Sequence, residues 1–282
     1  MEKFGEYIRR IEIESLWSGK KHIVWDLERS VNILSGVNGV GKSTILKKVV
    51  ARLVRGMKEG GEAGPDVKLT FEPADAVTVR FDVIHSFDRP LVHGSVLEKL
   101  ADARVVTELD RQLYLLQRRY LDYQVNVGNR MIAMLTSGDP QAREKAQEAA
   151  LARVQFQDMV DDLFSETGKK IVRSSNGIQL EQFGEMLSPY KLSSGEKQML
   201  VILLTVLVED RLPYVLFMDE PEISLHVEWQ QQLIACIRQL NPHAQIILAT
   251  HSPAVIMDGW LDAVTEVSDI TRTGNPSTPA EP

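Results

Sequence analysis

A glycine-rich segment at residues 36–44 carries residue types that bind phosphate. Its sequence, GVNGVGKST, fits the pattern G-x-x-x-x-G-K-[ST]. Glycines let the backbone turn tightly and direct its N–H groups inward, Lys42 can reach the β- and γ-phosphates of a nucleotide, and the Ser43 hydroxyl can ligate Mg²⁺. We therefore predict a nucleotide-binding loop that contains Gly36, Asn38, Gly39, Gly41, Lys42, Ser43 and Thr44.

A predicted strand and a predicted helix flank this loop. Val31–Leu34 form an apolar run directly before it, and apolar residues recur at helical spacing from Ile45 to Val54. The N-terminus of that helix adds partial positive charge where phosphates sit. Strand, turn and helix are the context that the motif needs, and they favour a phosphate loop over a chance glycine turn.

A second apolar run, YVLFMDEPE at residues 214–222, ends in acidic residues. A buried parallel strand delivers its C-terminal residues to the ligand crevice of an α/β sheet. We predict that Asp219 holds Mg²⁺, directly or through water, and that Glu220 orients or deprotonates the attacking water. Two adjacent acids alone suit an exposed turn equally well, and the upstream phosphate loop favours the catalytic interpretation.

His251 ends the next predicted strand, in the segment LATHSP at residues 248–253. The interval from Glu220 leaves room for a helix and a returning parallel strand. A lone histidine is usually structural. Because this strand should neighbour the acid-bearing one, we predict a catalytic or sensing role for His251, facing the γ-phosphate.

The segment KLSSGEKQ at residues 191–198 precedes an apolar helix. Ser193 and Glu196 fit a capping box, which is a sufficient structural explanation. In the functional interpretation, Ser193, the Gly195 N–H and the helix dipole form a second anion site. The segment comes shortly before the acid strand, so a second subunit would supply it in trans to a phosphate loop.

Composition is that of a globular domain of 282 residues with 44% hydrophobic residues and a net charge of −7. The acidic total argues against bulk nonspecific nucleic-acid binding and leaves a local basic patch open. No signal peptide is visible and the longest apolar run is too short to span a bilayer, so we expect a cytoplasmic protein without membrane contact. Cys236 is expected to be a core residue, and no disulfide framework exists.

Residues 96–167 predict an inserted antiparallel helical hairpin. Apolar residues recur in alternating steps of three and four from Val106 to Val127, the pattern of a coiled-coil seam. Asp139 is expected to cap the returning helix, with Pro140 as its first residue. We predict that the seam closes on itself and that the hairpin is a docking arm, dispensable for a folded core. Arginines spaced by seven on the first helix are interpreted as a solvated flank in preference to a phosphate-binding stripe.

The remaining patterns complete an α/β fold class. Three strands are expected within residues 7–34, and a β-hairpin is expected at 170–181 around a turn at Asn176. Further strands are expected at Val67–Phe71, Val77–Ile84, Tyr214–Met218, Gln245–Ala249 and Ala263–Val267. We predict a P-loop ATPase core with an antiparallel β-subdomain, divided into a phosphate-loop lobe at 1–95, the hairpin at 96–167, a signature, acid-strand and histidine lobe at 168–270, and a disordered tail at 271–282.

The order of GVNGVGKST, LSSGEKQ, MDEPEISLH and ATHSP resembles that of the ABC-type ATPase superfamily. A signature ending in GEKQ, together with DEPEISLH, resembles its non-transporter branch: the Rad50, SMC and RecF heads, the OLD-family ATPase domains, and the phage-defence ATPases of Septu and some retrons. The resemblance implies that Ser193 and Gly195 bind a partner's γ-phosphate. It also implies that Ser224 lies in the loop that crosses the dimer interface, and that His251 is the switch histidine.

Two features depart from the family pattern. The family's glutamine before the helical insert is not evident, and His85, Ser86 and Asp88 occupy its neighbourhood. No clear aromatic residue is placed to stack on adenine, and the candidates are Tyr7, Trp17 and Trp25. The insert has no zinc-hook cysteine pair, and no Toprim-like nuclease segment follows the ATPase part.

From these features we expect Mg²⁺-dependent ATP hydrolysis by a head-to-head homodimer that sandwiches two ATP molecules. The dimer would control a separate effector, such as a nuclease docked on the hairpin, in a DNA-linked process or phage defence; nucleic-acid binding stays open. The alternative is the ATP-binding subunit of an ABC transporter, which predicts an LSGGQ-type signature and a clear glutamine loop. A non-hydrolysing scaffold is disfavoured by the presence of Glu220 and His251.

Overall fold

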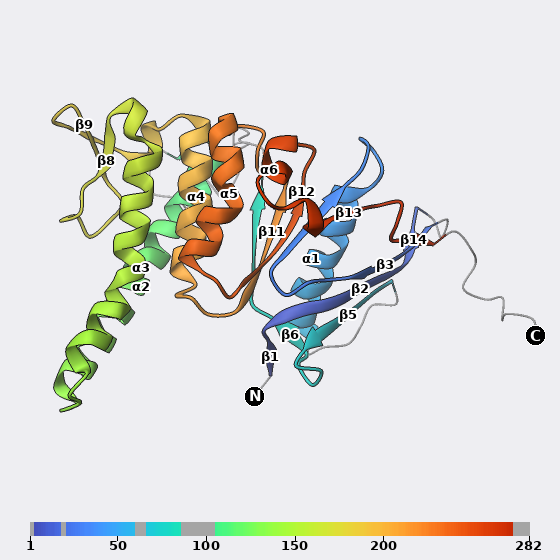
Figure 1. Ribbon diagram of the computed structural model, residues 1–282, viewed down its shortest axis with the longest axis horizontal. Coiled ribbons are helices and arrows are strands. Elements are labelled where there is room, and N and C mark those ends of the chain that lie inside the picture. Colours follow the sequence, from blue (N-terminus) through green and yellow to red (C-terminus); the bar gives the residue numbers. More distant parts are fainter. Residues whose placement is uncertain (1–2, 18–20, 60–65, 86–104, 273–282) are drawn as a thin grey trace, which may run out of the picture. The chain divides into compact units, whose positions relative to one another are not determined.

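The computed structural model describes residues 3–17, 21–59, 66–85 and 105–272, which form two compact units (Figure 1). Of these residues, the first unit contains those up to His85, then Pro213–Glu222 and those from His243 onward. The second unit contains residues 105–212 and Ile223–Pro242. Packing therefore groups the hairpin with the signature helix, and it places the acid strand and the histidine strand with the phosphate loop.

A five-stranded parallel sheet forms the centre of the first unit and confirms the predicted α/β class. Its strands follow the order β13 (Val264–Glu266), β4 (Val31–Ser35), β12 (Ala244–Ala249), β11 (Tyr214–Asp219) and β7 (Phe81–His85). The middle strands are buried along nearly their whole length, which explains their continuous apolar sequences. Asp219 pairs with Ala249, and Ala249 pairs with Leu34, so the strand ends that carry the candidate site are aligned.

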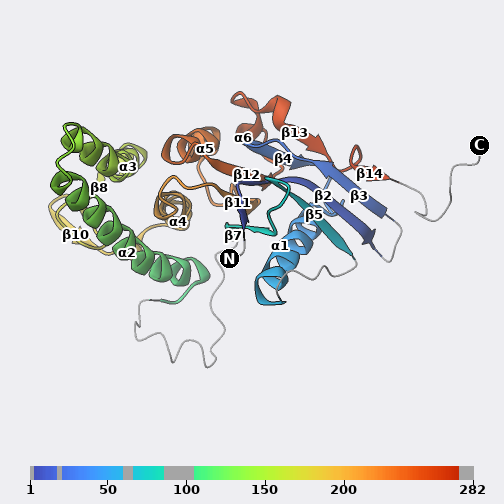
Figure 2. The same ribbon diagram turned by 90° about the horizontal axis from the view of Figure 1, so that it is seen from below.

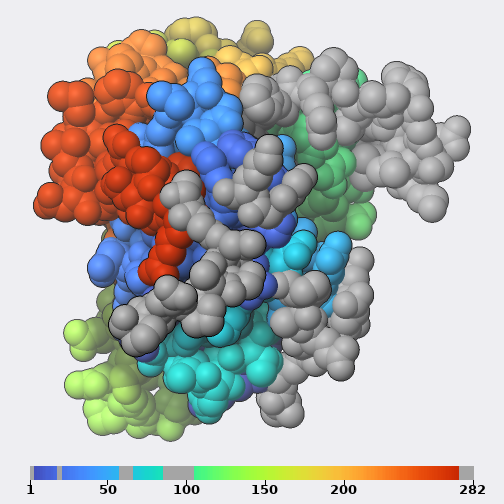
Figure 3. All heavy atoms as spheres, turned by 90° about the vertical axis from the view of Figure 1, so that its right-hand side faces the viewer, coloured from blue at the N-terminus to red at the C-terminus, as the bar shows by residue number. Residues whose placement is uncertain are grey.

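An antiparallel sheet completes this unit. Its strands follow the order β14 (Thr271–Arg272), β3 (Lys21–Asp26), β2 (Tyr7–Leu16) and β5 (Val67–Glu72). Helix α1 (Lys42–Glu59) lies beside β5, and one apolar core joins it to both sheets (Figure 2). Figure 3 shows atoms of the C-terminal segment, in red, beside those of the N-terminal strands, in blue. Thr271 and Arg272 thus form a strand on β3 and do not begin the predicted tail.

The expected single strand at Val77–Ile84 is two strands in different sheets. β6 (Thr78–Val79) pairs in parallel with β1 (Phe4–Gly5), whereas β7 lies at the edge of the parallel sheet. Arg80 separates them, and its carbonyl accepts the Val215 N–H at 2.9 Å. An apolar run does not reveal this change of partner, because both pieces are extended. Short helices α6 (Pro253–Met257) and η3 (Leu261–Ala263) complete the unit.

In its described residues, the second unit packs four α-helices and a small sheet. The helices are α2 (Glu108–Thr136), α3 (Ala142–Leu163), α4 (Ser194–Val208) and α5 (Val227–Leu240). The antiparallel sheet has the order β10 (Glu185–Leu187), β9 (Leu180–Gln182) and β8 (Lys169–Ile171), flanked by the 3-10 turns η1 (Ser165–Thr167) and η2 (Pro189–Lys191). The predicted β-hairpin is confirmed, with β10 as an additional strand. Within the described ranges, no helix combines the length and apolar character that a membrane span needs.

The predicted helical hairpin is confirmed as α2 and α3, which are joined by a short turn and contact each other. The predicted start of the second helix, with Asp139 as its cap and Pro140 as its first residue, is wrong. α3 begins at Ala142, and the carboxylate of Asp139 instead accepts the N–H of Gln141 at 2.8 Å within the turn. α2 begins with a capping box in which Thr107 and Asp110 exchange hydrogen bonds.

The hairpin closes on itself only in part, because its helices contact each other and also pack on a third helix. Both of its helices contact α4, whose side chains are buried along nearly the whole helix. Lys197 on α4 pairs with Asp110 on α2 at 2.9 Å, and both side chains are almost inaccessible to solvent. Because α4 is apolar all round, it needs packed helices on several sides. The hairpin is therefore part of the packing around the signature helix.

Candidate functional site

The phosphate loop joins β4 to α1 through a turn that only glycine fits easily. Gly36 and Gly41 have φ angles of +143° and +110°, outside the range that side-chain-bearing residues favour. A Cβ atom on Gly41 would also lie 3.2 Å from the ring of Trp17. Helix α1 begins at Lys42, so its N-terminal N–H groups lie at the loop, as anion binding requires.

The ammonium group of Lys42 folds back over this loop. Its Nζ atom donates to the carbonyl oxygens of Gly36 at 2.8 Å and Val37 at 3.3 Å, and the residue is 5% exposed. Burial lowers the pKa of Lys42, and the negative charges of Glu220, Asp219 and Glu222 oppose that shift. A phosphate group at the loop would add a further negative partner and favour the charged amine.

Ser43 and Asp219 bring two oxygen ligands together. The hydroxyl of Ser43, in the first turn of α1, donates to Oδ1 of Asp219, the last residue of β11, at 2.8 Å. Hydroxyl and carboxylate oxygens suit Mg²⁺, which keeps several water molecules and binds substrate phosphates alongside one or two protein ligands. Among the described residues, no cluster of three or more His, Cys, Asp or Glu forms a metal site. The pair fits a magnesium shared with a nucleotide better than a metal bound by protein alone.

Glu220 leaves β11 in a left-handed conformation. Its φ angle is +51°, which is uncommon for a residue with a side chain, and its N–H donates to the Ala249 carbonyl at 2.7 Å. Its Oε1 lies 3.3 Å from Nε2 of His251, and both side chains keep partial contact with solvent. Strained residues cluster at functional sites, where neighbouring contacts hold them in place. The two predicted catalytic side chains therefore face each other at the ends of adjacent strands.

Glu222 is a member of this cluster that the sequence analysis did not assign. It is 8% exposed, and its Oε1 accepts hydrogen bonds from the Thr250 hydroxyl and from the His251 N–H, the latter at 3.2 Å. The carboxylate thus ties the turn after β11 to the turn after β12 and orients the backbone of His251. The only sequence signal was the third acid of DEPE, which by itself suits a solvent-exposed turn equally well.

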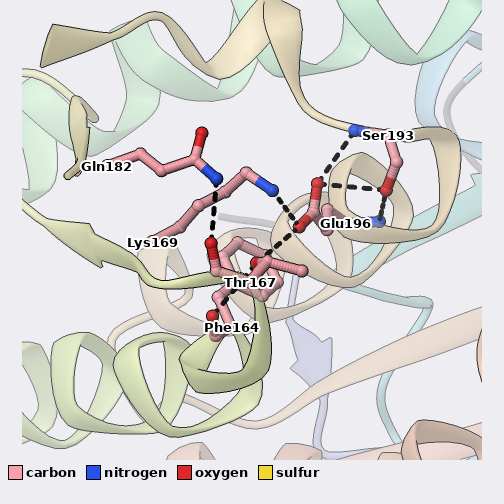
Figure 4. Close-up of polar contacts among 6 residues, drawn as sticks. All are labelled: Phe164, Thr167, Lys169, Gln182, Ser193 and Glu196. Carbon is pink, nitrogen blue, oxygen red and sulfur yellow. Dashed lines mark hydrogen bonds and ion pairs between the residues drawn. The ribbon is translucent and has the colours of Figure 1, made fainter. Parts of the chain in front are cut away.

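The signature segment forms a second cluster, in the second unit (Figure 4). Ser193 caps α4: its hydroxyl accepts the Glu196 N–H at 3.3 Å, and the Glu196 carboxylate accepts from the Ser193 N–H at 2.9 Å and hydroxyl at 3.0 Å. The predicted capping box is confirmed. The second carboxylate oxygen of Glu196 accepts from Lys169 at 2.7 Å and from Thr167 at 3.1 Å. This connects the cap to η1 and β8.

Hydrogen bonds keep the Glu196 carboxylate charged. Burial would raise its pKa, but hydrogen bonds from Lys169 and Ser193 outweigh that effect and lower the pKa below the ordinary value. In Figure 4 the Gln182 side chain reaches the Thr167 carbonyl, at 2.8 Å, so the three-stranded sheet braces the same network. The signature serine is therefore held by a charged, largely buried pair.

Gly195 and Ser224 lie against each other in this second cluster. A Cβ atom on Gly195 would overlap the carbonyl oxygen of Ser224, so only glycine fits there. The resemblance implied that both residues lie at a dimer interface, and the structure places them side by side within one chain. The candidate residues therefore form two clusters: the phosphate-loop cluster of Lys42, Ser43, Asp219, Glu220 and His251, and the signature cluster of Ser193, Gly195 and Ser224.

The three aromatic candidates for adenine stacking differ in exposure and in their distance from the phosphate loop. Trp25 is buried at 1% exposure in the core of the first unit. Tyr7 lies on β2 and faces the guanidinium of Arg29, 5.9 Å from its ring centre. Trp17, 43% exposed, lies beside Gly41 of the phosphate loop. Of the three, Trp17 is the one that the structure places at the loop.

Two further predictions concern the residues near the family's glutamine position and the single cysteine. His85 ends β7 in register with Asp219, while its side chain, together with Ser86 and Asp88, lies outside the described residues. Cys236 is buried in α5 as predicted, and burial raises the pKa of its thiol to about 11. A neutral buried thiol behaves as a small apolar core residue.

Comparisons with known proteins agree with this geometry. Residues 95–258, more than half of the chain, match the family described as "AAA domain, putative AbiEii toxin, Type IV TA system". A segment of 84 residues is 31% identical to the retron Vc95 probable ATPase of Vibrio cholerae serotype O1 biovar El Tor. That match covers 26% of this chain and 16% of the retron protein, so it concerns only a small part of that protein.

A solved SMC head shares the fold. The SMC head bound to the C-winged helix domain of ScpA has a TM-score of 0.50 and 13% identity, over 89% of this chain and 91% of that one. The SMC head domain from Thermotoga maritima has a TM-score of 0.45 and 14% identity over the same shares. Together with the family match, the first of these confirms the predicted resemblance to non-transporter ABC-type P-loop ATPases.

Proposed function

The chain belongs to the family described as an AAA domain, putative AbiEii toxin of type IV TA systems, and on that premise we propose that it hydrolyses ATP in a homodimer. The observation that carries the proposal is the phosphate-loop cluster. A phosphate-binding turn, a hydroxyl–carboxylate pair and a Glu220–His251 pair converge at the ends of adjacent parallel strands. Phosphoryl transfer needs this set of groups, because its catalysis rests on positioning and charge stabilisation.

Each group of the cluster has a separate task. The loop N–H groups and Lys42 hold the phosphates, and Ser43 and Asp219 hold Mg²⁺, which neutralises charge on the phosphate oxygens when bound. Glu220 accepts a hydrogen bond from the attacking water and orients it. His251, 3.3 Å from Glu220, holds that carboxylate in place, and Glu222 fixes the backbone of His251. Trp17 supplies an exposed aromatic face beside the loop for the adenine ring.

The signature cluster acts on the nucleotide of a second subunit. Ser193 is exposed at the N-terminus of α4, where its hydroxyl, the Gly195 N–H and the helix dipole suit a γ-phosphate. Its hydroxyl donates to Glu196 at 3.0 Å, and the same hydroxyl can turn to a phosphate at this helix terminus. Two subunits arranged head to head would then enclose two ATP molecules, each held by one phosphate loop and one signature.

ATP-driven dimerisation would control a separate effector in a DNA-linked process or in phage defence. The names of the relatives support this proposal, since one is a retron probable ATPase and another is an SMC head bound to part of ScpA. The transporter alternative has less support, because the signature ends in GEKQ and the similar structures above are SMC heads.

The test is ATP-dependent dimerisation, measured by size-exclusion chromatography with light scattering. On a Glu220→Gln background, in which hydrolysis is slowed, ATP and Mg²⁺ should convert monomer to dimer. Ser193→Arg places bulk and positive charge where the partner's nucleotide docks, so this variant should bind ATP and remain monomeric. Ser174→Arg makes the same change at an exposed serine outside the signature and should dimerise normally.

Mixing variants tests whether the site is shared. Ser193→Arg subunits keep their phosphate loop, and Lys42→Ala subunits keep their signature. A mixture should regain at most one composite site per heterodimer and therefore a fraction of the wild-type activity. If Ser193→Arg alone dimerises and hydrolyses ATP like wild type, the signature is only a helix cap and the shared-site proposal fails.

A further inference from the structure

Helix α2 carries a second heptad series beside the buried one. Its members alternate steps of four and three along the helix: Tyr114, Arg118, Leu121, Val125, Gly128, Ile132 and Leu135. This spacing keeps them on one face of an α-helix and is the spacing of a coiled-coil seam. We call these seven residues the outer seam.

The outer seam faces solvent. Leu121, Val125, Ile132 and Leu135 are 43%, 60%, 63% and 56% exposed, whereas Leu113 and Tyr120 of the first seam are almost fully buried. One apolar stripe is enough to pack a helix onto its domain. A second stripe with large exposed side chains at regular spacing marks an interaction surface.

The residue types indicate how many helices this seam accepts. The β-branched Val125 and Ile132 alternate with Leu121 and Leu135, the arrangement that favours a two-stranded parallel coiled coil. Gly128 lies between them, and a Cβ atom there would meet nothing within 4 Å. The seam therefore has room for one helix, with a hole at Gly128 for a large apolar side chain.

Arg118 supplies a charge within the seam. Its guanidinium stacks on Tyr114, 5.2 Å from the ring centre, and donates to the phenol oxygen at 3.1 Å. Its neighbours Arg111 and Arg119 pair with Glu108 and Glu209, but within the described ranges no carboxylate pairs with Arg118. A single charged residue at a core position of a coiled coil specifies register and partner. The complementary residue is an acid on the incoming helix.

The N-terminal end of the outer seam leads into a hollow of about 470 Å³. Tyr114, Arg118 and Leu121 line one side, and Met186 of β10 and Tyr190 of η2 line the other. The Gln117 amide donates to the Tyr190 hydroxyl at 3.0 Å and links the two sides. Because η2 ends two residues before Ser193, a group in this hollow adjoins the segment that carries the signature serine.

We propose that the outer seam docks one amphipathic helix of the effector protein, with apolar residues at heptad spacing and an acidic residue facing Arg118. The proposal deepens the proposed function, since it assigns a surface and a partner chemistry to effector control. Its test measures binding in the absence of nucleotide, so its failure would leave ATP hydrolysis and dimerisation untouched.

The test uses a fluorescent synthetic peptide of about four heptads, with Ile and Leu at the core positions and one Glu placed to face Arg118. A second peptide of the same composition has its apolar residues out of register. Fluorescence anisotropy with the full chain should show binding of the first peptide only. Val125→Lys with Ile132→Lys should raise the Kd by about tenfold or more, because two charges enter the apolar seam.

Matched controls separate docking from unfolding and from self-association. Leu115→Lys changes an exposed apolar residue of α2 outside the seam and should leave binding unchanged. Arg118→Glu should weaken binding, and a peptide with Lys in place of its Glu should restore it. Circular dichroism should show the same helix content in every variant, because the changed side chains are exposed.

Three outcomes would overturn the proposal. The in-register peptide fails to bind, or it binds wild type and the double lysine variant equally. In the third, light scattering without nucleotide shows a dimer that Val125→Lys with Ile132→Lys abolishes, which would mean that a second copy of this chain covers the seam.

Discussion

His251 Nε2 lies 3.3 Å from Glu220 Oε1, although the two residues lie in the turns that follow different strands. Their closeness follows from the pairing of β11 with β12, which aligns Asp219 with Ala249 and brings both following turns to one edge of the sheet. Glu222 adds a second link between the same turns through Thr250 and the His251 N–H. Changes at this edge should therefore affect catalysis more than folding.

Glu220→Gln should leave ATP binding intact and lower hydrolysis by about 10²-fold or more, because the amide keeps the shape of the side chain and loses its basicity. Phosphate release under saturating ATP measures the rate. Glu228→Gln, at an exposed acid in the first turn of α5, is the matched control and should release phosphate at the wild-type rate. Hydrolysis by Glu220→Gln within a factor of two of wild type would remove Glu220 from the catalytic role.

Lys42→Ala should abolish measurable ATP binding, because it removes the buried ammonium group that donates a hydrogen bond to the Gly36 carbonyl of the phosphate loop. Isothermal titration with ATP and Mg²⁺ measures the affinity. Lys47→Ala removes an exposed lysine of the same helix and should bind like wild type. Near-native affinity in Lys42→Ala would contradict the assignment of the loop.

Asp110→Asn should destabilise the second unit, because it removes the carboxylate partner of Lys197, whose side chain is almost buried. Breaking a buried ion pair costs about 3 kcal/mol. Urea unfolding measures the loss, and a double-mutant cycle with Lys197→Met should show coupling between the two sites. Asp122→Asn, at an exposed position of α2, should change little. If Asp110→Asn unfolds like wild type, this ion pair does not stabilise the signature helix. That result would favour the prediction that the hairpin is dispensable for a folded core.

Lys169→Met should destabilise the signature cap by about 3 kcal/mol for the same reason, since Lys169 and Glu196 form a largely buried pair. Lys170→Met, at the exposed neighbour on β8, is the control. Because the folded pKa of Glu196 is lowered, its contribution is present above the ordinary value of 4.5 and is lost as pH falls through the lowered pKa.

The lowered pKa of Glu196 can be tested by the pH dependence of stability. The free energy of unfolding from urea titrations should fall below pH 4.5 more steeply in wild type than in Glu196→Gln, which has no carboxylate to protonate at this site. Parallel curves for the two proteins would show that the Lys169–Glu196 pair adds no net stability.

The sequence by itself determined the local features of the first unit. A phosphate loop needs glycines at left-handed turns, and buried parallel strands need continuous apolar runs, so both are visible residue by residue. The capping box at Ser193 is equally local, because it needs only residues three apart. Those signals placed Lys42 at the start of a helix and Asp219 at the end of a strand, as the structure has them, while His251 lies in the turn just beyond β12.

Tertiary structure decided which surfaces those elements share. Gly195 meets Ser224, and Glu222 meets Thr250, through contacts that no local spacing records. Helix α2 shows the reason most clearly. Its two heptad seams look alike in sequence, yet one packs inside the unit and the other faces solvent. Hydrophobic periodicity specifies that a helix face is apolar, whereas burial depends on which distant segment covers that face, and only the folded chain determines that.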